Sequence, residues 1–124
     1  MSKVNVQIVC GILLILVLIQ SISGHKVYRV GDNQGWNPNV DFKAWSARKT
    51  FHLGDVLEFN YGEGLEVQEV SAKVFQSCNH NGAVIFEDHS GKTAIPLRRN
   101  GSHYFICGVF DYCNHGMKLN ITVN

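Results

Sequence analysis

Hydrophobic and polar residues alternate along the last eight positions of the chain. Met117, Leu119, Ile121 and Val123 are apolar, and the residues between them are polar. This period of two predicts a β-strand with one buried face. Residues 56–61 alternate in the same way. Other short runs rich in β-branched and aromatic residues lie at residues 26–30, 65–70, 83–86 and 103–107.

Turn-forming residues separate these runs. Clusters of Gly, Asn, Asp and Ser lie at residues 31–35, 54–55, 62–64, 79–82, 88–91 and 99–101. Short strands between such turns predict an all-β sandwich or barrel in a single domain. Two segments depart from the strand pattern and predict short helices: residues 41–49, where Phe42 and Trp45 are three apart, and residues 71–77, where Ser71 can cap the first turn.

The first 24 residues have the features of a secretory signal peptide. Lys3 precedes the uncharged, apolar run 8–19, and a stretch of small residues follows. The apolar run is shorter than the roughly 20 residues that a membrane-spanning helix needs. We expect cleavage after Gly24, which leaves residues 25–124 as a secreted domain. The alternative is an uncleaved N-terminal anchor; other membrane association would be peripheral.

Composition and charge exclude several classes of protein. A hydrophobic content of 45% excludes a disordered chain. The formal net charge of +1 leaves no basic stripe for binding nucleic acid. No arrangement of nucleophile and base, phosphate loop or paired carboxylates stands out, so we expect no enzyme. Glu63, Glu66 and Glu69 are interpreted as a solvated strand face.

Secretion determines how the cysteines are interpreted. Cys10 would leave with the signal peptide, and Cys78, Cys107 and Cys113 would remain. In an oxidising compartment two of these three should pair, and the residues alone leave all three pairings open. The same compartment permits N-glycosylation at two sequons, which begin at Asn100 and Asn120.

Several motifs share their order and spacing with one known family. They lie at residues 30–36, 51–61, 77–78, 95–97, 103–109, 113 and 116–119. Together they resemble the phytocyanins, the plant family of blue copper proteins. The resemblance implies a cupredoxin-like Greek-key β-sandwich of about seven or eight strands in two sheets, with one or two short helices. It also implies a disulfide between Cys78 and Cys113, for which loop closure predicts roughly 4 kcal/mol of stabilisation.

The resemblance also locates the positions of a type 1 copper site, which uses two imidazoles, a thiolate and a weak axial ligand. These positions are occupied by Leu65, Cys107, Tyr112 and Met117. Leu65 has no lone pair, and Tyr112 could ligate only as a phenolate, from a pKa near 10. Only Cys107 and Met117 remain as plausible ligands. We therefore expect a degenerate site and no cofactor, with copper bound through the two sulfurs as the alternative.

Each remaining candidate also has a structural interpretation. Met117 and Cys107 suit inward-facing core positions. Phe110 and Tyr112, with His115, suit either an exposed partner-facing loop or, for the two aromatics, a plug that fills the space of the lost ligands. His115, His80 and His103 are interpreted as exposed loop or strand-edge residues. His25 would become the new N-terminus and could chelate Cu²⁺ adventitiously.

The sequence thus predicts a secreted protein of the apoplast or cell surface that acts as a non-redox interaction module. Its partner would be a protein or a cell-wall carbohydrate, and its oligomeric state stays open. The loss of both imidazoles resembles the early-nodulin-like members of the family, whereas the short length, without a Pro/Ser-rich tail or GPI signal, resembles the plantacyanins. The competing hypothesis is a blue copper electron carrier with substituted ligands around Cys107 and Met117.

Overall fold

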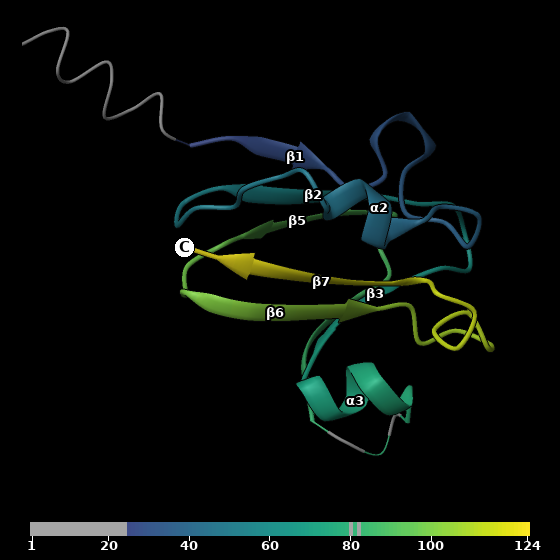
Figure 1. Ribbon diagram of the computed structural model, residues 1–124. Coiled ribbons are helices and arrows are strands. Elements are labelled where there is room, and N and C mark those ends of the chain that lie inside the picture. Colours follow the sequence, from purple (N-terminus) through teal and green to yellow (C-terminus); the bar gives the residue numbers. More distant parts are fainter. Residues whose placement is uncertain (1–24, 80, 82) are drawn as a thin grey trace, which may run out of the picture.

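The computed structural model describes residues 25–79, 81 and 83–124, and its seven strands form two sheets that face each other (Figure 1). The three-stranded sheet has the order β1 (Val27–Arg29), β2 (Val56–Asn60) and β5 (Lys92–Pro96). The four-stranded sheet has the order β4 (Val84–Asp88), β3 (Val67–Val70), β6 (Gly101–Ile106) and β7 (Lys118–Val123). Strand β1 runs parallel to β2, and the other pairs are antiparallel. The predicted all-β two-sheet sandwich is confirmed.

Both predicted helices form, and a side chain caps each of them, although only the Ser71 cap was predicted from the sequence. Helix α2 (Phe42–Ser46) begins after Asp41, whose side chain accepts a hydrogen bond from the Ala44 N–H. Helix α3 (Ala72–Ser77) begins after Ser71, whose hydroxyl accepts from the Val74 N–H. Helix α2 packs on β7 and α3 on β6. A short 3₁₀ helix, η1 (Asp32–Gln34), was not predicted from the sequence.

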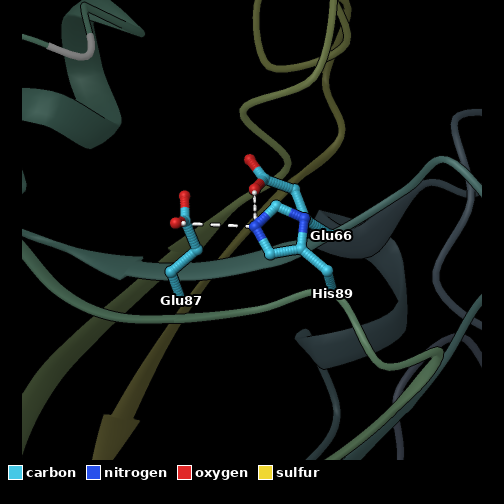
Figure 2. Close-up of side chains that lie close together, drawn as sticks. All are labelled: Glu66, Glu87 and His89. Atoms are coloured by element: carbon cyan, nitrogen blue, oxygen red, sulfur yellow. Dashed lines mark ion pairs between the residues drawn. The ribbon is translucent and has the colours of Figure 1, made fainter.

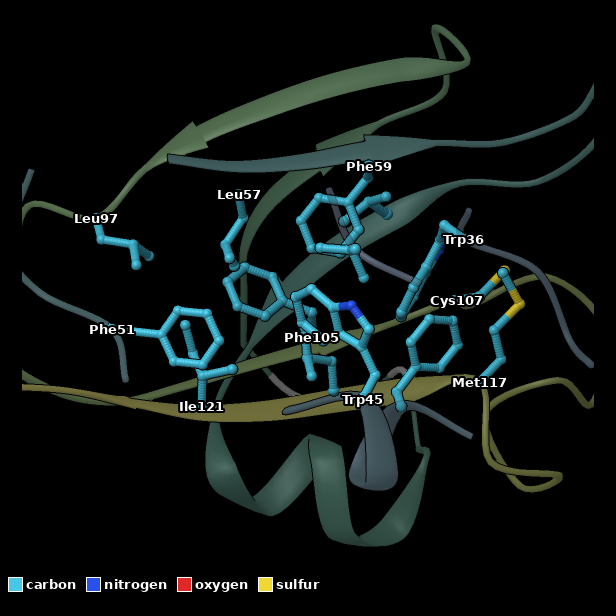
Figure 3. Packing of buried hydrophobic residues seen from close by; sticks show 14 of the residues in the cluster. Trp36, Trp45, Phe51, Leu57, Phe59, Leu97, Phe105, Cys107, Met117 and Ile121 are labelled. Atoms are coloured by element: carbon cyan, nitrogen blue, oxygen red, sulfur yellow. The ribbon is translucent and has the colours of Figure 1, made fainter. Parts of the chain in front are cut away.

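Aromatic side chains fill the space between the two sheets (Figure 3). The Trp36 ring meets Phe59 edge-on with centroids 5.1 Å apart, and Phe59 packs on Phe105 at 5.4 Å. The alternation predicted at the C-terminus is present, because Leu119 and Ile121 of β7 are buried while Asn120 between them is exposed. The same core includes Cys107 and Met117, so it also holds two of the four positions assigned from the resemblance.

A tight turn between two glycines positions the Trp36 side chain in that core. Gly31 and Gly35 have φ of 77° and 73°, in the left-handed region that favours glycine. A Cβ on Gly31 would collide with the Gly35 carbonyl oxygen. The turn allows the Trp36 backbone N–H to donate to the Asn60 carbonyl at 2.8 Å and its indole N–H to donate to the Glu66 carbonyl at 2.8 Å.

Three sequence interpretations need correction. Strand β5 was not predicted: Thr93 and Ile95 are β-branched and face inward, but the alternating run is short and ends in a proline, which argues against a strand in a sequence. Glu66 is buried rather than solvated, because hydrogen bonds from the Gln68 amide and the Gly108 N–H replace water. His103 is also buried, 6% exposed, since its ring nitrogens lie 3.0 Å from a Glu69 carboxylate oxygen and 2.8 Å from the Arg99 carbonyl.

The predicted signal peptide at residues 1–24 and the histidine at position 80 lie outside the described residues. Within the part of the chain that the structure describes, no helix is both long and apolar enough to cross a membrane. The two sequons remain predictions, and both asparagines are exposed: Asn100 lies between β5 and β6, and Asn120 lies within β7.

The disulfide expected from the resemblance is present. It joins Cys78, which follows α3, to Cys113 in the loop between β6 and β7, with the Cα atoms 5.8 Å apart. Cys78 adopts a left-handed conformation at the end of the helix and its N–H donates to the Val74 carbonyl. The bond therefore attaches α3 covalently to the loop that carries three of the four candidate site positions.

Removing this disulfide should destabilise the fold by about 4 kcal/mol, because the bond closes a loop with a sequence separation of 35 residues in the unfolded chain. The test is urea unfolding of a Cys78→Ala/Cys113→Ala variant beside the oxidised wild type. A Cys107→Ser variant serves as a control that removes a cysteine without removing the bond. A loss below about 1 kcal/mol would contradict the loop-closure account.

Candidate functional site

The four positions assigned from the copper-protein resemblance lie together at one end of the core. Leu65 stands two residues before β3, Cys107 directly follows β6, and Met117 directly precedes β7. The Cys107 N–H donates to the Met117 carbonyl at 3.1 Å, and the Met117 N–H donates to the Tyr112 carbonyl at 2.9 Å. All four side chains belong to or pack against the interlayer core. The spacing of the sequence motif thus corresponds to a real spatial cluster.

The cluster offers two sulfur atoms and no imidazole. Cys107 and Met117 are fully buried, and their side chains point toward one another (Figure 3). Cys107 is the free cysteine of the described residues. Burial raises the pKa of its thiol, because the low-dielectric core disfavours the thiolate. Leu65 contributes only an aliphatic group, and Tyr112 contributes a half-buried ring that packs on the core.

Phe110 and Tyr112, in the loop between β6 and β7, each fit a different one of the two interpretations made from the sequence. Tyr112 packs against the core, as expected of a plug. Phe110 is 85% exposed, with a backbone φ of 51° that turns the chain at the loop tip. The two rings meet edge-on with centroids 5.7 Å apart. One aromatic therefore fills space and the other is presented to solvent.

Histidines near this loop do not enter the cluster. His115 has an exposed side chain, and its Nδ1 lies 2.7 Å from the Asp111 backbone carbonyl. His103 is held on the far part of β6 by Glu69 and Arg99. His25 is exposed at the start of the described chain. None of these three rings replaces an imidazole beside Cys107.

Directly behind the cluster lies a polar centre that sequence reasoning missed. Glu66, the residue after Leu65, is 3% exposed, and its Oε1 accepts hydrogen bonds from the Gly108 N–H at 2.8 Å and the Gln68 amide at 2.7 Å. Burial raises the pKa of the Glu66 carboxyl, and the neighbouring Glu87 carboxylate raises it further. Gly108 follows Cys107, so this carboxylate also helps to fix the loop that starts at the thiol.

Glu66 belongs to a group of three side chains from different segments (Figure 2). Glu87 comes from β4 and His89 from the turn after it. His89 Nε2 lies 3.2 Å from Glu66 Oε2 and 3.5 Å from Glu87 Oε2. The Gln68 amide donates to both carboxylates, at 2.7 and 2.8 Å. The one usable sequence signal was the spacing of Glu66 and Gln68, two apart on one strand segment; nothing in the sequence connects them to residues 87–89.

The comparisons with known proteins agree with this fold and motif. The chain matches the plastocyanin-like domain family model over residues 36–117. It is 42% identical to a blue copper protein of Pisum sativum, over 99% of this chain and 65% of that protein. It is 41% identical to stellacyanin of Toxicodendron vernicifluum, over 78% of this chain and 95% of that protein. The chain spans 51% of the length of uclacyanin-3 of Arabidopsis thaliana, to which it is 36% identical.

Solved structures give the same answer. Cucumber stellacyanin, whose structure is described with Cu²⁺, superposes with a TM-score of 0.71 at 35% identity, covering 80% of this chain and 94% of that one. Cucumber basic protein, a blue copper protein, gives a TM-score of 0.71 at 33% identity, covering 79% and 99%. Fold and motif together define a plastocyanin-like protein of the cupredoxin class. Within that class, the chain belongs to the phytocyanin family.

The Cys107 thiol should react slowly in the folded protein, because it is fully buried and its thiolate is disfavoured. At pH 8 we expect a reaction with a disulfide reagent on the order of 100-fold slower in buffer than in concentrated urea. Subtracting the Cys107→Ser trace assigns the signal to this cysteine. Rapid labelling of the folded protein would show that the end of the core opens readily.

Proposed function

We propose that this protein is a secreted phytocyanin domain that does not form a type 1 copper centre and acts as a binding module at the cell surface or in the cell wall. The observation that carries the proposal is the donor set beside Cys107. Two of the four positions are filled by Leu65, which has no donor atom, and by Tyr112, whose ring packs into the core. A trigonal site of two imidazoles and a thiolate cannot be assembled from these side chains.

Packing gives a second reason for this conclusion. Cys107 and Met117 contact the core on all sides, as ordinary small and medium apolar groups do. An imidazole in place of Leu65 or Tyr112 would change the packed volume at the edge of the core. The backbone of the loop would keep its shape, because its backbone hydrogen bonds and the Cys113 disulfide do not involve the side chains of the cluster.

One observation favours the alternative of an electron carrier with substituted ligands. The thiol of Cys107 and the thioether of Met117 point toward one another at the same end of the core (Figure 3). Two sulfur donors are a soft pair of the kind that Cu⁺ prefers. The relatives include proteins named as blue copper proteins. The two functions differ in whether a copper–thiolate bond forms, and this bond has a direct optical signature.

Titration with Cu²⁺ should give no intense thiolate-to-copper band in the wild type, because no imidazole is available to complete the site. A Leu65→His/Tyr112→His variant should gain this band, since both side chains pack against the core cluster that contains Cys107 and Met117. Visible absorption of the two proteins is the measurement, and adding Cys107→Ser to the double variant should abolish the band. An intense band in the wild type that Cys107→Ser removes would establish the electron carrier instead.

The surface that we propose for binding is the tip of the loop between β6 and β7. Phe110 exposes 85% of its surface there, which is unusual for a large apolar side chain, and the Tyr112 ring supports it edge-on. Backbone contacts on either side keep the loop in shape, including the Tyr112 N–H bond to the Val109 carbonyl. A rigid, exposed aromatic is the type of side chain that anchors interfaces with proteins and flat sugar rings.

Wild-type protein should be retained on washed plant cell-wall material, and Phe110→Ala should weaken retention about tenfold, the loss expected for one exposed aromatic anchor. The matched control is Leu53→Ala, an exposed apolar residue in the turn before β2 and outside this loop. Protease treatment of the wall separates a protein partner from a carbohydrate. Equal retention of all three proteins would contradict a role for Phe110.

A further inference from the structure

We propose that Glu66, Glu87 and His89 form a second, separate site that binds a divalent transition-metal ion of the zinc type through oxygen and nitrogen. This site lies between β3, β4 and the turn after β4, and it uses none of the four positions discussed above (Figure 2). It therefore does not depend on whether copper binds at Cys107.

The spacing of the three donor groups suits such an ion. Zinc binds nitrogen and oxygen at about 2.0–2.2 Å in tetrahedral geometry, which places neighbouring donor atoms about 3.4 Å apart. His89 Nε2 lies 3.2 Å from Glu66 Oε2 and 3.5 Å from Glu87 Oε2. One ligand atom from each residue lies within 4.8 Å of the others. Small side-chain movements are enough to close all three around one ion.

The two carboxylates of the group would be stabilised by a bound cation. Two carboxylates converge on the same imidazole and the same amide, and Glu66 is 3% exposed, so water offsets little of its charge. The ion pairs that these carboxylates make within the described residues are both with His89, which is 62% exposed. A divalent ion would give both carboxylates a full counter-charge, which the single shared imidazole contact does not provide.

Gln68 provides the independent observation that points to a ligand. Its side chain is 5% exposed and directed into the group, with Nε2 donating to Glu66 and Glu87. Its Oε1 is buried and has no hydrogen-bond partner among the described residues. An unpaired buried carbonyl costs free energy. Once an ion neutralises both carboxylates, a turn of the amide about its last bond would direct this oxygen toward the metal as a fourth ligand, in exchange for the two hydrogen bonds that Nε2 donates in the metal-free protein.

The surroundings hold the buried ligand in position while leaving access from solvent. The Gly108 N–H fixes Glu66 Oε1, the kind of outer hydrogen bond that orients metal ligands. Glu87 and His89 are largely exposed, so an ion can enter without any part of the fold opening. The mixed oxygen and imidazole donors suit Zn²⁺, and by the Irving–Williams order also Cu²⁺, better than Ca²⁺ or Mg²⁺.

Isothermal titration of the metal-free protein with Zn²⁺ tests the proposal. We expect the wild type to bind zinc at this site, and Glu87→Gln and His89→Gln each to weaken that binding at least about tenfold, as loss of a ligand predicts. At a zinc concentration of 100 Kd the melting temperature should rise by about 10 °C in the wild type and hardly at all in a Glu87→Gln/His89→Gln variant. Both side chains are exposed, so the variants should fold.

Two control variants separate this site from adventitious binding. His115→Gln removes an exposed histidine that also lies beside a carboxylate, that of Asp111, and His25→Gln removes the imidazole nearest the start of the described chain. Both should bind zinc as the wild type does. The Gly108 amide resonance should shift when zinc is added, because its acceptor oxygen belongs to the Glu66 carboxylate whose other oxygen becomes a metal ligand. Equal zinc affinity in the wild type and in Glu87→Gln/His89→Gln would overturn the proposal, as would a wild type that binds no zinc at millimolar concentration.

Discussion

A carboxylate taken out of water must receive hydrogen bonds or opposite charge in place of its hydration, and Glu66 is where this constraint shapes the molecule. Its side chain joins its own strand segment, which carries Gln68, to two segments that are distant in sequence: the turn that carries His89 and the loop that begins at Cys107. Its backbone carbonyl receives the indole N–H of Trp36 from the opposite direction. One residue thus ties the aromatic core, the edge of the four-stranded sheet and the loop after β6 together.

Alternation and turn chemistry predicted most of the frame. The C-terminal strand and the strand around Leu57 and Phe59 follow from alternation. The two helices follow from the spacing of Phe42 and Trp45 and from the Ser71 cap. Strand β5 was missed, because its alternation rests on only two inward-facing residues, Thr93 and Ile95, and the run ends in a proline. Its proline is tolerated because it ends a strand at the edge of the sheet.

The candidate site shows a similar division. The positions of Cys107, Tyr112 and Met117 could be taken from motif spacing, and their proximity is a consequence of strand ends that the fold brings together. Glu66 and His103 were misinterpreted, because a charged residue in a strand is expected in solvent unless its partner is known. Glu66 contacts His89 and Gly108, and His103 contacts Glu69. These partners lie 23 to 42 residues away in the sequence, so a local pattern carries no information about them.

The disulfide at Cys113 has an implication for how this family can diversify. The loop between β6 and β7 is anchored by a covalent bond near its middle and by backbone pairing between Cys107 and Met117 at its base. Neither anchor depends on the identity of the residue at the tip. The same framework can therefore carry a metal-binding loop in one descendant and an aromatic recognition loop in another, so that chemistry is exchanged while architecture is inherited.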